Sequence, residues 1–121
     1  DQAPFIRFRG CREHIDEPIL KVQQWLDRYY REKISVRVMA KRSGLNERTF
    51  LRRFKNATGE APLEYLQKMR IEKAKQLLTE TGKSLTEITQ AVGYVDLSSF
   101  RRLFRQVVGI SPTAYRQRFK D

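Results

Sequence analysis

Arginines placed one helical turn apart are the residues of this sequence with the clearest chemistry. Arg48 and Arg52 are four residues apart, and so are Ser98 and Arg102, so a helix would place each pair on one face. The guanidinium of arginine carries parallel donors that match two acceptors of guanine, O6 and N7. The spacing therefore predicts two helical faces able to bind base edges. The alternative is that these arginines only solvate exposed helices.

The elements that must position these arginines occur twice in the chain. Residues 35–65 and 84–115 share seven landmarks in the same order, with one inserted residue in the second copy. The matched pairs are Ser35 and Ser84, Gly44 and Gly93, Phe50 and Phe100, Phe54 and Phe104, Gly59 and Gly109, Pro62 and Pro112, and Tyr65 and Tyr115. A repeat of this period indicates one supersecondary unit used more than once. Because two copies are too few for a solenoid, we predict a pseudo-symmetric pair of subdomains.

The apolar residues of both copies recur at steps of three and four, which is the period of a helix, and no alternating strand pattern of useful length occurs. We expect an all-α fold of seven helices, which begin near Asp16, Ser35, Asn46, Pro62, Ser84, Leu97 and Pro112. Each copy then comprises a short helix, a glycine turn and a second helix. This is the helix-turn-helix arrangement, whose second helix enters the major groove of DNA.

Spacing also predicts which side chains face inward. In the second helices of the two copies these are Phe50, Leu51, Phe54 and Ala57, and Phe100, Leu103, Phe104 and Val107. The first helix is expected to bury one face, made of Ile19, Val22, Trp25, Leu26 and Tyr29. The long helix carries its apolar pattern on Leu63, Leu66, Ile71, Ala74, Leu77 and Leu78. The paired arginines then lie on faces that point away from the cores.

Charge and composition favour a polyanionic partner. The 121 residues carry a net charge of +11, and 40% of them are apolar, which is enough for modest cores. No stretch approaches the length of a membrane span, and no signal-peptide pattern opens the chain. The single cysteine, Cys11, fits a reducing compartment. We therefore predict a cytoplasmic, nucleoid-associated protein that binds double-stranded DNA and no membrane.

The chain resembles the DNA-binding domain of the AraC/XylS transcriptional regulators over about residues 16–119. The likeness is most specific in the second-copy stretch VGYVDLSSFRRLFRQVVGISPTAYR and the first-copy run FLRRFKNATGEAPLEYL. It implies two helix-turn-helix subdomains of homeodomain-like form joined by a long helix, in a regulator, more often an activator, that contacts RNA polymerase. The run MAKRSGLNERTFLRRFKNATGEAPLEYLQKMRIEKAKQLL is similar to members with an N-terminal amidase-like (class I glutamine amidotransferase-like) domain. We expect that sensing and oligomerisation domain to lie outside this chain.

The resemblance also divides the chain and locates its DNA contacts. The expected parts are a linker over 1–15, a first subdomain over 16–60, a connecting helix over 61–80 and a second subdomain over 81–121. Base contacts of the first copy fall on Arg48 and Arg52, with Glu47, Thr49 and Arg53 beside them. Those of the second fall on Leu97, Ser98 and Arg102, with Arg101 nearby, and Arg105 flanks the same face by spacing. Because Leu97 and Ser98 lack the longer polar side chains of some relatives, two readings stay open: Leu97 contacts a thymine methyl group, or the second unit mainly grips the backbone.

The connecting helix has a mechanical meaning. About 18 residues from Pro62 to Thr79 would span roughly 27 Å, and major grooves on one face of DNA recur about every 34 Å. No glycine or proline interrupts the segment between Leu63 and Thr81, so we expect a rigid rod. Such a rod would hold both second helices in successive grooves of a non-palindromic site and require the DNA to bend.

We predict no catalytic site, metal site or cofactor. His14 is the only histidine and has no cysteine or carboxylate at ligand spacing, so it is expected in the linker or on the surface. Cys11 has no adjacent acid–base partner, and no phosphate-binding glycine motif occurs. The alternative to a sequence-specific regulator is an architectural module that coats nucleic acid without sequence preference. The ratio of specific to non-specific affinity separates the two. An enzyme would need a catalytic part outside this chain.

Overall fold

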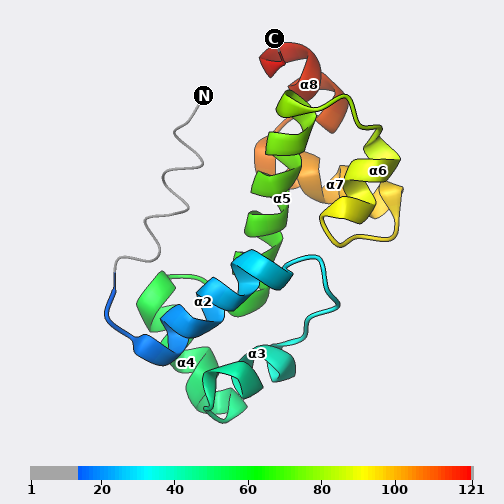
Figure 1. Ribbon diagram of the computed structural model, residues 1–121. Helices are drawn as coiled ribbons and strands as arrows, with labels where there is room; N and C mark the ends of the chain where they lie inside the picture. Colours follow the sequence, from blue (N-terminus) through cyan, green and yellow to red (C-terminus); the bar gives the residue numbers. More distant parts are fainter. Residues whose placement is uncertain (1–13, 121) are drawn as a thin grey trace.

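The computed structural model describes residues 14–120, and that range contains seven helices and no strand. The helices are α2 (Glu17–Tyr29), α3 (Val36–Ser43), α4 (Glu47–Thr58), α5 (Pro62–Glu80), α6 (Leu85–Ala91), α7 (Leu97–Val108) and α8 (Pro112–Phe119). The prediction of an all-α fold with seven helices is confirmed. Helices α2, α3 and α4 gather at one end of the long helix α5, and α6, α7 and α8 gather at the other (Figure 1). Cys11 and nearly all of the predicted linker lie outside the described residues.

Side-chain caps fix where most of these helices begin. An oxygen of the N-cap side chain accepts a hydrogen bond from the backbone N–H three residues on, at 2.9–3.2 Å, in Ser35, Asn46, Ser84, Asp96 and Ser111. These oxygens satisfy amide donors that the first turn of a helix leaves unpaired. The short helices and the second helices of both repeats are therefore delimited by local chemistry.

The first unit is built around an aromatic core. Phe50, Phe54 and Tyr65 are fully buried, and the rings of Phe54 and Tyr65 meet edge to face with centroids 5.2 Å apart. The buried amide of Gln23 donates to the Tyr65 hydroxyl at 3.1 Å, so both polar groups have a partner inside the core. The remaining buried apolar residues come from α2, α3 and α5: Ile19, Val22, Leu26, Met39, Ala40, Leu66 and Met69.

The second unit repeats this core. Phe100 and Phe104 are fully buried, and Phe104 meets the half-buried ring of Tyr115 edge to face at a centroid distance of 5.7 Å. Apolar residues of α5, α6 and the following turn complete it: Ile71, Ala74, Leu78, Ile88 and Val92. The repeat that is visible in the sequence is therefore also a repeat in packing.

Helix α5 is part of both cores. Its first half supplies the first core with Tyr65, Leu66 and Met69, and its second half supplies the second core with Ile71, Ala74 and Leu78. The change falls at Arg70. The three residues of the second half have the same spacing as Ile19, Val22 and Leu26 of α2. The second half of α5 therefore does for the second unit what α2 does for the first.

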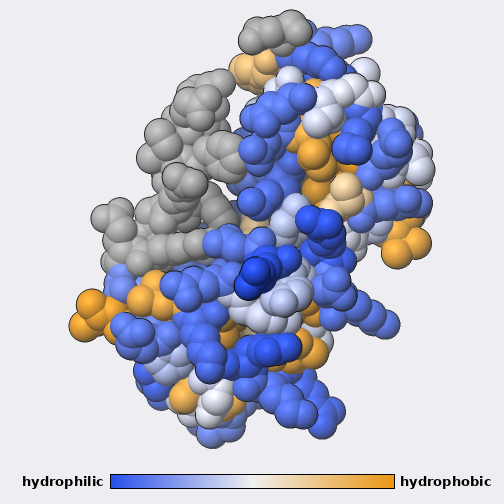
Figure 2. Space-filling view, viewed as in Figure 1, coloured by the Kyte–Doolittle hydropathy of each residue, from blue (hydrophilic) through white to orange (hydrophobic). Residues whose placement is uncertain are grey.

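Four residues predicted to face inward lie on the surface. Leu51 is 41% exposed, Val107 is 43% exposed, and Tyr29 and Leu63 are exposed to a similar degree. Leu51 follows the buried Phe50 by one residue, and this step turns it by about 100° out of the narrow buried stripe. Tyr29 ends α2, and the centroid of its ring lies 5.5 Å from that of Trp25. Hydrophobic residues on the face drawn in Figure 2 occur in small separate groups among hydrophilic ones. Within residues 14–120, no helix is both long and apolar enough to cross a bilayer.

Candidate nucleic-acid interface

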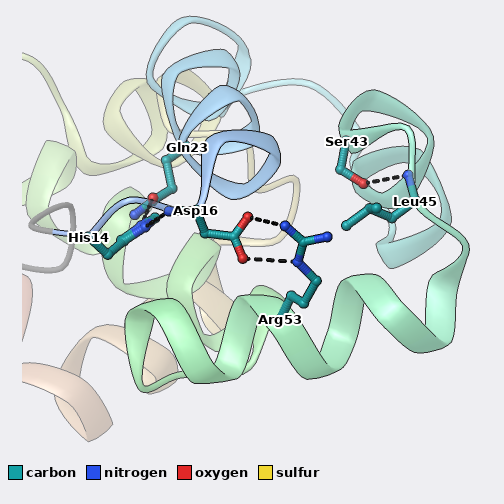
Figure 3. A network of polar contacts seen from close by, with 6 residues as sticks. All are labelled: His14, Asp16, Gln23, Ser43, Leu45 and Arg53. Carbon is teal, nitrogen blue, oxygen red and sulfur yellow. Dashed lines mark hydrogen bonds and ion pairs between the residues drawn. The ribbon is translucent and has the colours of Figure 1, made fainter.

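Helices α4 and α7 bury one face against an aromatic core and leave the other face open. Each follows a short helix and a turn, so the turn sets its direction. In the first turn, the Ser43 hydroxyl donates to the Ala40 carbonyl at 2.6 Å and accepts from the Leu45 amide at 3.1 Å (the Ser43–Leu45 contact is drawn in Figure 3). The turn is therefore held by its own side chain, and α4 leaves it at a fixed angle.

The arginine pair of α4 points to solvent. Arg48 and Arg52 are exposed, Glu47 beside them is exposed, and Thr49 is half-buried. Among residues 14–120, the ion pairs of the structure involve neither Arg48 nor Arg52. Their guanidinium donors are therefore available to a ligand with two parallel acceptors.

Arg53, which was predicted beside these contacts, has a partner inside the protein. Its Nε donates to Oδ2 of Asp16 at 3.0 Å and its Nη2 donates to Oδ1 at 2.8 Å (Figure 3). These hydrogen bonds are the main reason why the pKa of Asp16 lies below its ordinary value. Asp16 occupies the N-cap position of α2, but its side chain makes no capping hydrogen bond. The pair instead fastens α4 to the start of α2.

Helix α7 offers a second exposed basic face, made of Ser98, Arg101, Arg102 and Arg105. Its N-cap, Asp96, accepts hydrogen bonds from the hydroxyl and the backbone N–H of Ser99. These bonds lower the pKa of Asp96, and the charge of Arg102 adds to the effect. Leu97 is half-buried against the second core. The thymine contact considered for Leu97 stays a prediction, and part of this side chain already packs on the second core.

A joint between the two units was not predicted from the sequence. Arg70 of α5 donates from Nε to the Tyr30 carbonyl and from Nη2 to the Glu32 carbonyl, both at 2.8 Å. Its guanidinium also lies over the ring of Tyr94, 5.1 Å from the centroid. Tyr30 and Glu32 belong to the loop between α2 and α3, whereas Tyr94 lies in the turn before α7. One cation therefore ties the first unit to the turn that directs α7.

The backbones of the two units also touch at this joint. Gly93, beside Tyr94, has a φ of 100°, and a Cβ added to it would lie 3.0 Å from the Cα of Arg31. Burial raises the pKa of Tyr94, and the nearby charge of Arg70 partly offsets this shift. The glycine is therefore required both by its conformation and by the approach of the α2–α3 loop.

Sequence reasoning also missed Val95, the most exposed of the large apolar residues in the described range, at 96%. It lies in the turn before α7, between Tyr94 and Asp96. The signal that could have identified it was the single inserted residue in the second repeat.

His14 is not a loose surface residue. Its Nε2 donates to Oε1 of Gln23 at 2.8 Å, while Nδ1 accepts the backbone N–H of Asp16 at 3.1 Å (Figure 3). It therefore holds the entry to α2. In the described part of the chain, no group of three His, Cys, Asp or Glu side chains is arranged to hold a metal ion.

Comparison with known proteins places this geometry in a family. Residues 39–118, most of the chain, match the model of a helix-turn-helix domain. The chain belongs to the helix-turn-helix domain family. The MmsAB operon regulatory protein of Pseudomonas aeruginosa is 39% identical to this helix-turn-helix domain over 100 residues, which are 79% of the chain and 33% of that protein. The transcriptional activator RhaS of Escherichia fergusonii is 35% identical over 105 residues, 87% of the chain and 38% of that protein. The chain therefore spans between 33% and 38% of the length of these relatives.

Solved structures share the arrangement of both units. The DNA-binding domain of AdpA, a global transcriptional factor solved in complex with a target DNA, has a TM-score of 0.81 and 34% identity, over 84% of this chain and 92% of that one. A transcriptional regulator with an AraC-type DNA-binding domain from Chromobacterium violaceum has a TM-score of 0.79 and 26% identity, over 84% and 91%. The prediction of an AraC-type domain from a transcriptional regulator is confirmed.

Proposed function

We propose that this helix-turn-helix domain reads a double-stranded DNA sequence with α4 and α7 in successive major grooves and thereby regulates transcription. The observation that carries the proposal is the repeated arrangement of an aromatic face turned inward and exposed arginines turned outward. Charge alone would attract DNA of any sequence. Arginines fixed on the open face of a helix can in addition select guanine, which favours a specific reader over an architectural module.

The joint supports reading by both units together. Helix α5 has 19 residues and a length of about 28 Å, which is shorter than the groove repeat of about 34 Å. Arg70 holds the α2–α3 loop and the turn before α7 against this helix. Since the protein cannot easily lengthen, the DNA has to bend to meet both helices, so affinity will depend on how easily the site deforms.

We assign different roles to the exposed residues. Arg48 and Arg52 read bases in the first groove, with Glu47 and Thr49 beside them. In the second groove Arg102 and Ser98 face the bases, while Arg101 and Arg105 neutralise phosphates. The hydrogen bonds of Arg53 to Asp16 support a positioning role for this residue, in which it orients α4, with any phosphate contact secondary.

The full-length protein is proposed to be a transcriptional activator that works at the nucleoid in the cytoplasm. The relatives are about three times as long as the matched segment, which leaves room for a further domain. The sequence resemblance favours an amidase-like sensing domain at the N-terminus and recruitment of RNA polymerase. Activation is tested by expressing the full-length protein with a promoter that carries the selected site and measuring transcription from that promoter.

The DNA-binding proposal is tested by selecting sites from random duplexes and measuring affinity for a selected and a scrambled duplex at the same salt concentration. We expect Arg48→Ala and Arg52→Ala each to weaken binding to the selected site by about 1–3 kcal/mol. Binding to the scrambled site should fall much less. Arg28→Ala is the matched control, because it removes the same charge from an exposed position on α2. Equal losses on both duplexes would show that Arg48 and Arg52 only hold phosphate.

A further inference from the structure

Two large apolar side chains are almost completely exposed in the described chain: Ile15, at 94%, and Val95, at 96%. Ile15 precedes α2, at the start of the first unit. Val95 lies between α6 and α7, in the middle of the second unit. An isolated exposed valine needs no explanation by itself. The position of Val95 in the turn before α7 does need an explanation, because the matching turn of the first unit has no such residue.

The fold of the turn does not use Val95. In the first unit, Gly44 is followed by Leu45, which packs on the first core, and then by the N-cap Asn46. In the second unit, Tyr94 packs on the second core and Asp96 is the N-cap. Both turns therefore have one inward residue and one cap. Val95 is the additional residue, and it packs on neither core.

Val95 is placed at the end of α7 that would meet the bases. It directly precedes the N-cap Asp96, and the N-terminal residues of a recognition helix are those that contact base edges. The exposed Ser98 follows within one turn. A valine side chain has no hydrogen-bond donor for a phosphate, and the neighbouring carboxylate of Asp96 repels one. The ligand that fits this side chain is therefore an apolar group in the major groove, and thymine supplies one in its 5-methyl group.

We propose that Val95 contacts a thymine methyl group in the second half of the DNA site and so contributes to sequence selection by α7. This inference rests on the proposed function. It assigns apolar readout to the inserted residue of the repeat and leaves Leu97 to the core. Ser98 and Arg102 supply the polar part of the same contact surface.

The test uses the selected site and replaces its thymines one at a time by deoxyuridine, which removes only the methyl group. We expect one position in the second half of the site at which the parent loses about threefold to tenfold in affinity. Val95→Ala should bind the thymine and deoxyuridine forms of that position equally. Val107→Ala is the matched control, since it truncates an exposed valine at the other end of α7 and should keep the full methyl dependence.

The results that would overturn the Val95 contact differ from those that would overturn the proposed function. A specific site whose methyl dependence is the same in the parent and in Val95→Ala at every position overturns the contact but leaves DNA reading intact. Equal weakening of the thymine and deoxyuridine forms by Val95→Ala also overturns it, because it points to a sugar contact. Failure to select any specific site overturns both. Unchanged melting of Val95→Ala, expected for so exposed a side chain, confirms that the fold is not the cause.

Discussion

Replacing Gly93 by alanine perturbs the joint between the two units at its closest contact. The new Cβ would lie 3.0 Å from Cα of Arg31, 3.1 Å from Nε of Arg70 and 3.2 Å from the carbonyl oxygen of Arg31. Two of these atoms belong to backbone, and the third belongs to a guanidinium that donates hydrogen bonds to the carbonyls of Tyr30 and Glu32. None of them can move at little cost. The alanine must therefore displace the turn that leads into α7.

The matching glycine of the first unit separates conformation from packing. Gly44 has a φ of 79°, and a Cβ added to it would meet no heavy atom within 4 Å. Gly44→Ala should therefore lower the free energy of unfolding by only the left-handed penalty, roughly 1–2 kcal/mol. Gly93→Ala carries that penalty together with overpacking of roughly 1–3 kcal/mol. We therefore expect a total loss of about 2–5 kcal/mol at Gly93.

Two measurements on both variants check this reasoning. Urea unfolding followed by far-UV circular dichroism gives the free energies. Fluorescence anisotropy with the full selected site, and with a half-site that contains only the part bound by α4, gives the affinities. We expect Gly93→Ala to lose about tenfold or more on the full site, which corresponds to roughly 1.4 kcal/mol or more, and little on the half-site. Gly44→Ala should change the full-site and half-site affinities by similar factors.

The result that would refute the reasoning is equally specific. If both variants unfold with the same free energy and Gly93→Ala binds the full site like the parent, the joint accommodates the extra methyl group without moving α7. The orientation of α7 would then be set elsewhere.

Other perturbations test the cores, the shared helix and the ion pair. Phe54→Ala and Phe104→Ala should each lower the free energy of unfolding by about 3–5 kcal/mol through cavity formation, and melting within a couple of degrees of the parent would contradict their place in the cores. Two alanines inserted after Gln76 should abolish the second unit's helicity, because they split the buried stripe that α5 gives to the second core. The same insertion after Arg70 leaves the buried stripes of both cores whole and should abolish only full-site binding. Equal losses of helicity in the two variants would contradict the division of α5. The pKa of Asp16 is lowered in the folded state, so its pair stabilises the fold above the ordinary aspartate pKa and ceases to do so as the pH falls through the lower folded value. Asp16→Asn should therefore destabilise the domain at neutral pH and flatten the loss of unfolding free energy in that acid range; parallel pH profiles for parent and variant would exclude the pair as a cause.

Local signals in the sequence were sufficient to predict where the helices lie. The caps Ser35 and Asn46 act on amides three residues away, and apolar periodicity identified the buried rings Phe50 and Phe54. The inward prediction for Leu51 was wrong because residue type does not define how wide a buried stripe is. Apolar character alone therefore overestimated the core.

The features that could not be predicted from the sequence depend on contacts between residues far apart in the chain. Arg53 carries the same charge as Arg52, yet its partner Asp16 lies 37 residues away in the chain. Nothing local distinguishes an arginine held by a carboxylate from one left to solvent. The bonds from Arg70 to the α2–α3 loop span 38 and 40 residues and are equally invisible to periodicity. The role of Arg48 in contacting DNA stays a prediction that only the binding measurements test.

The division of α5 at Arg70 determines how this protein could be recombined with a relative. Chimeras are usually joined in loops, and Gly82 would be the obvious crossover point here. A crossover there would pair Ile71, Ala74 and Leu78 of one parent with α6, α7 and α8 of another, so the second core would be assembled from mismatched halves. A crossover inside the helix, at Arg70, keeps the buried residues of each core together, and of the partly buried residues only Tyr30 packs against both cores. For exchanging half-site specificities between regulators, the boundary of the module is therefore a point within a continuous helix.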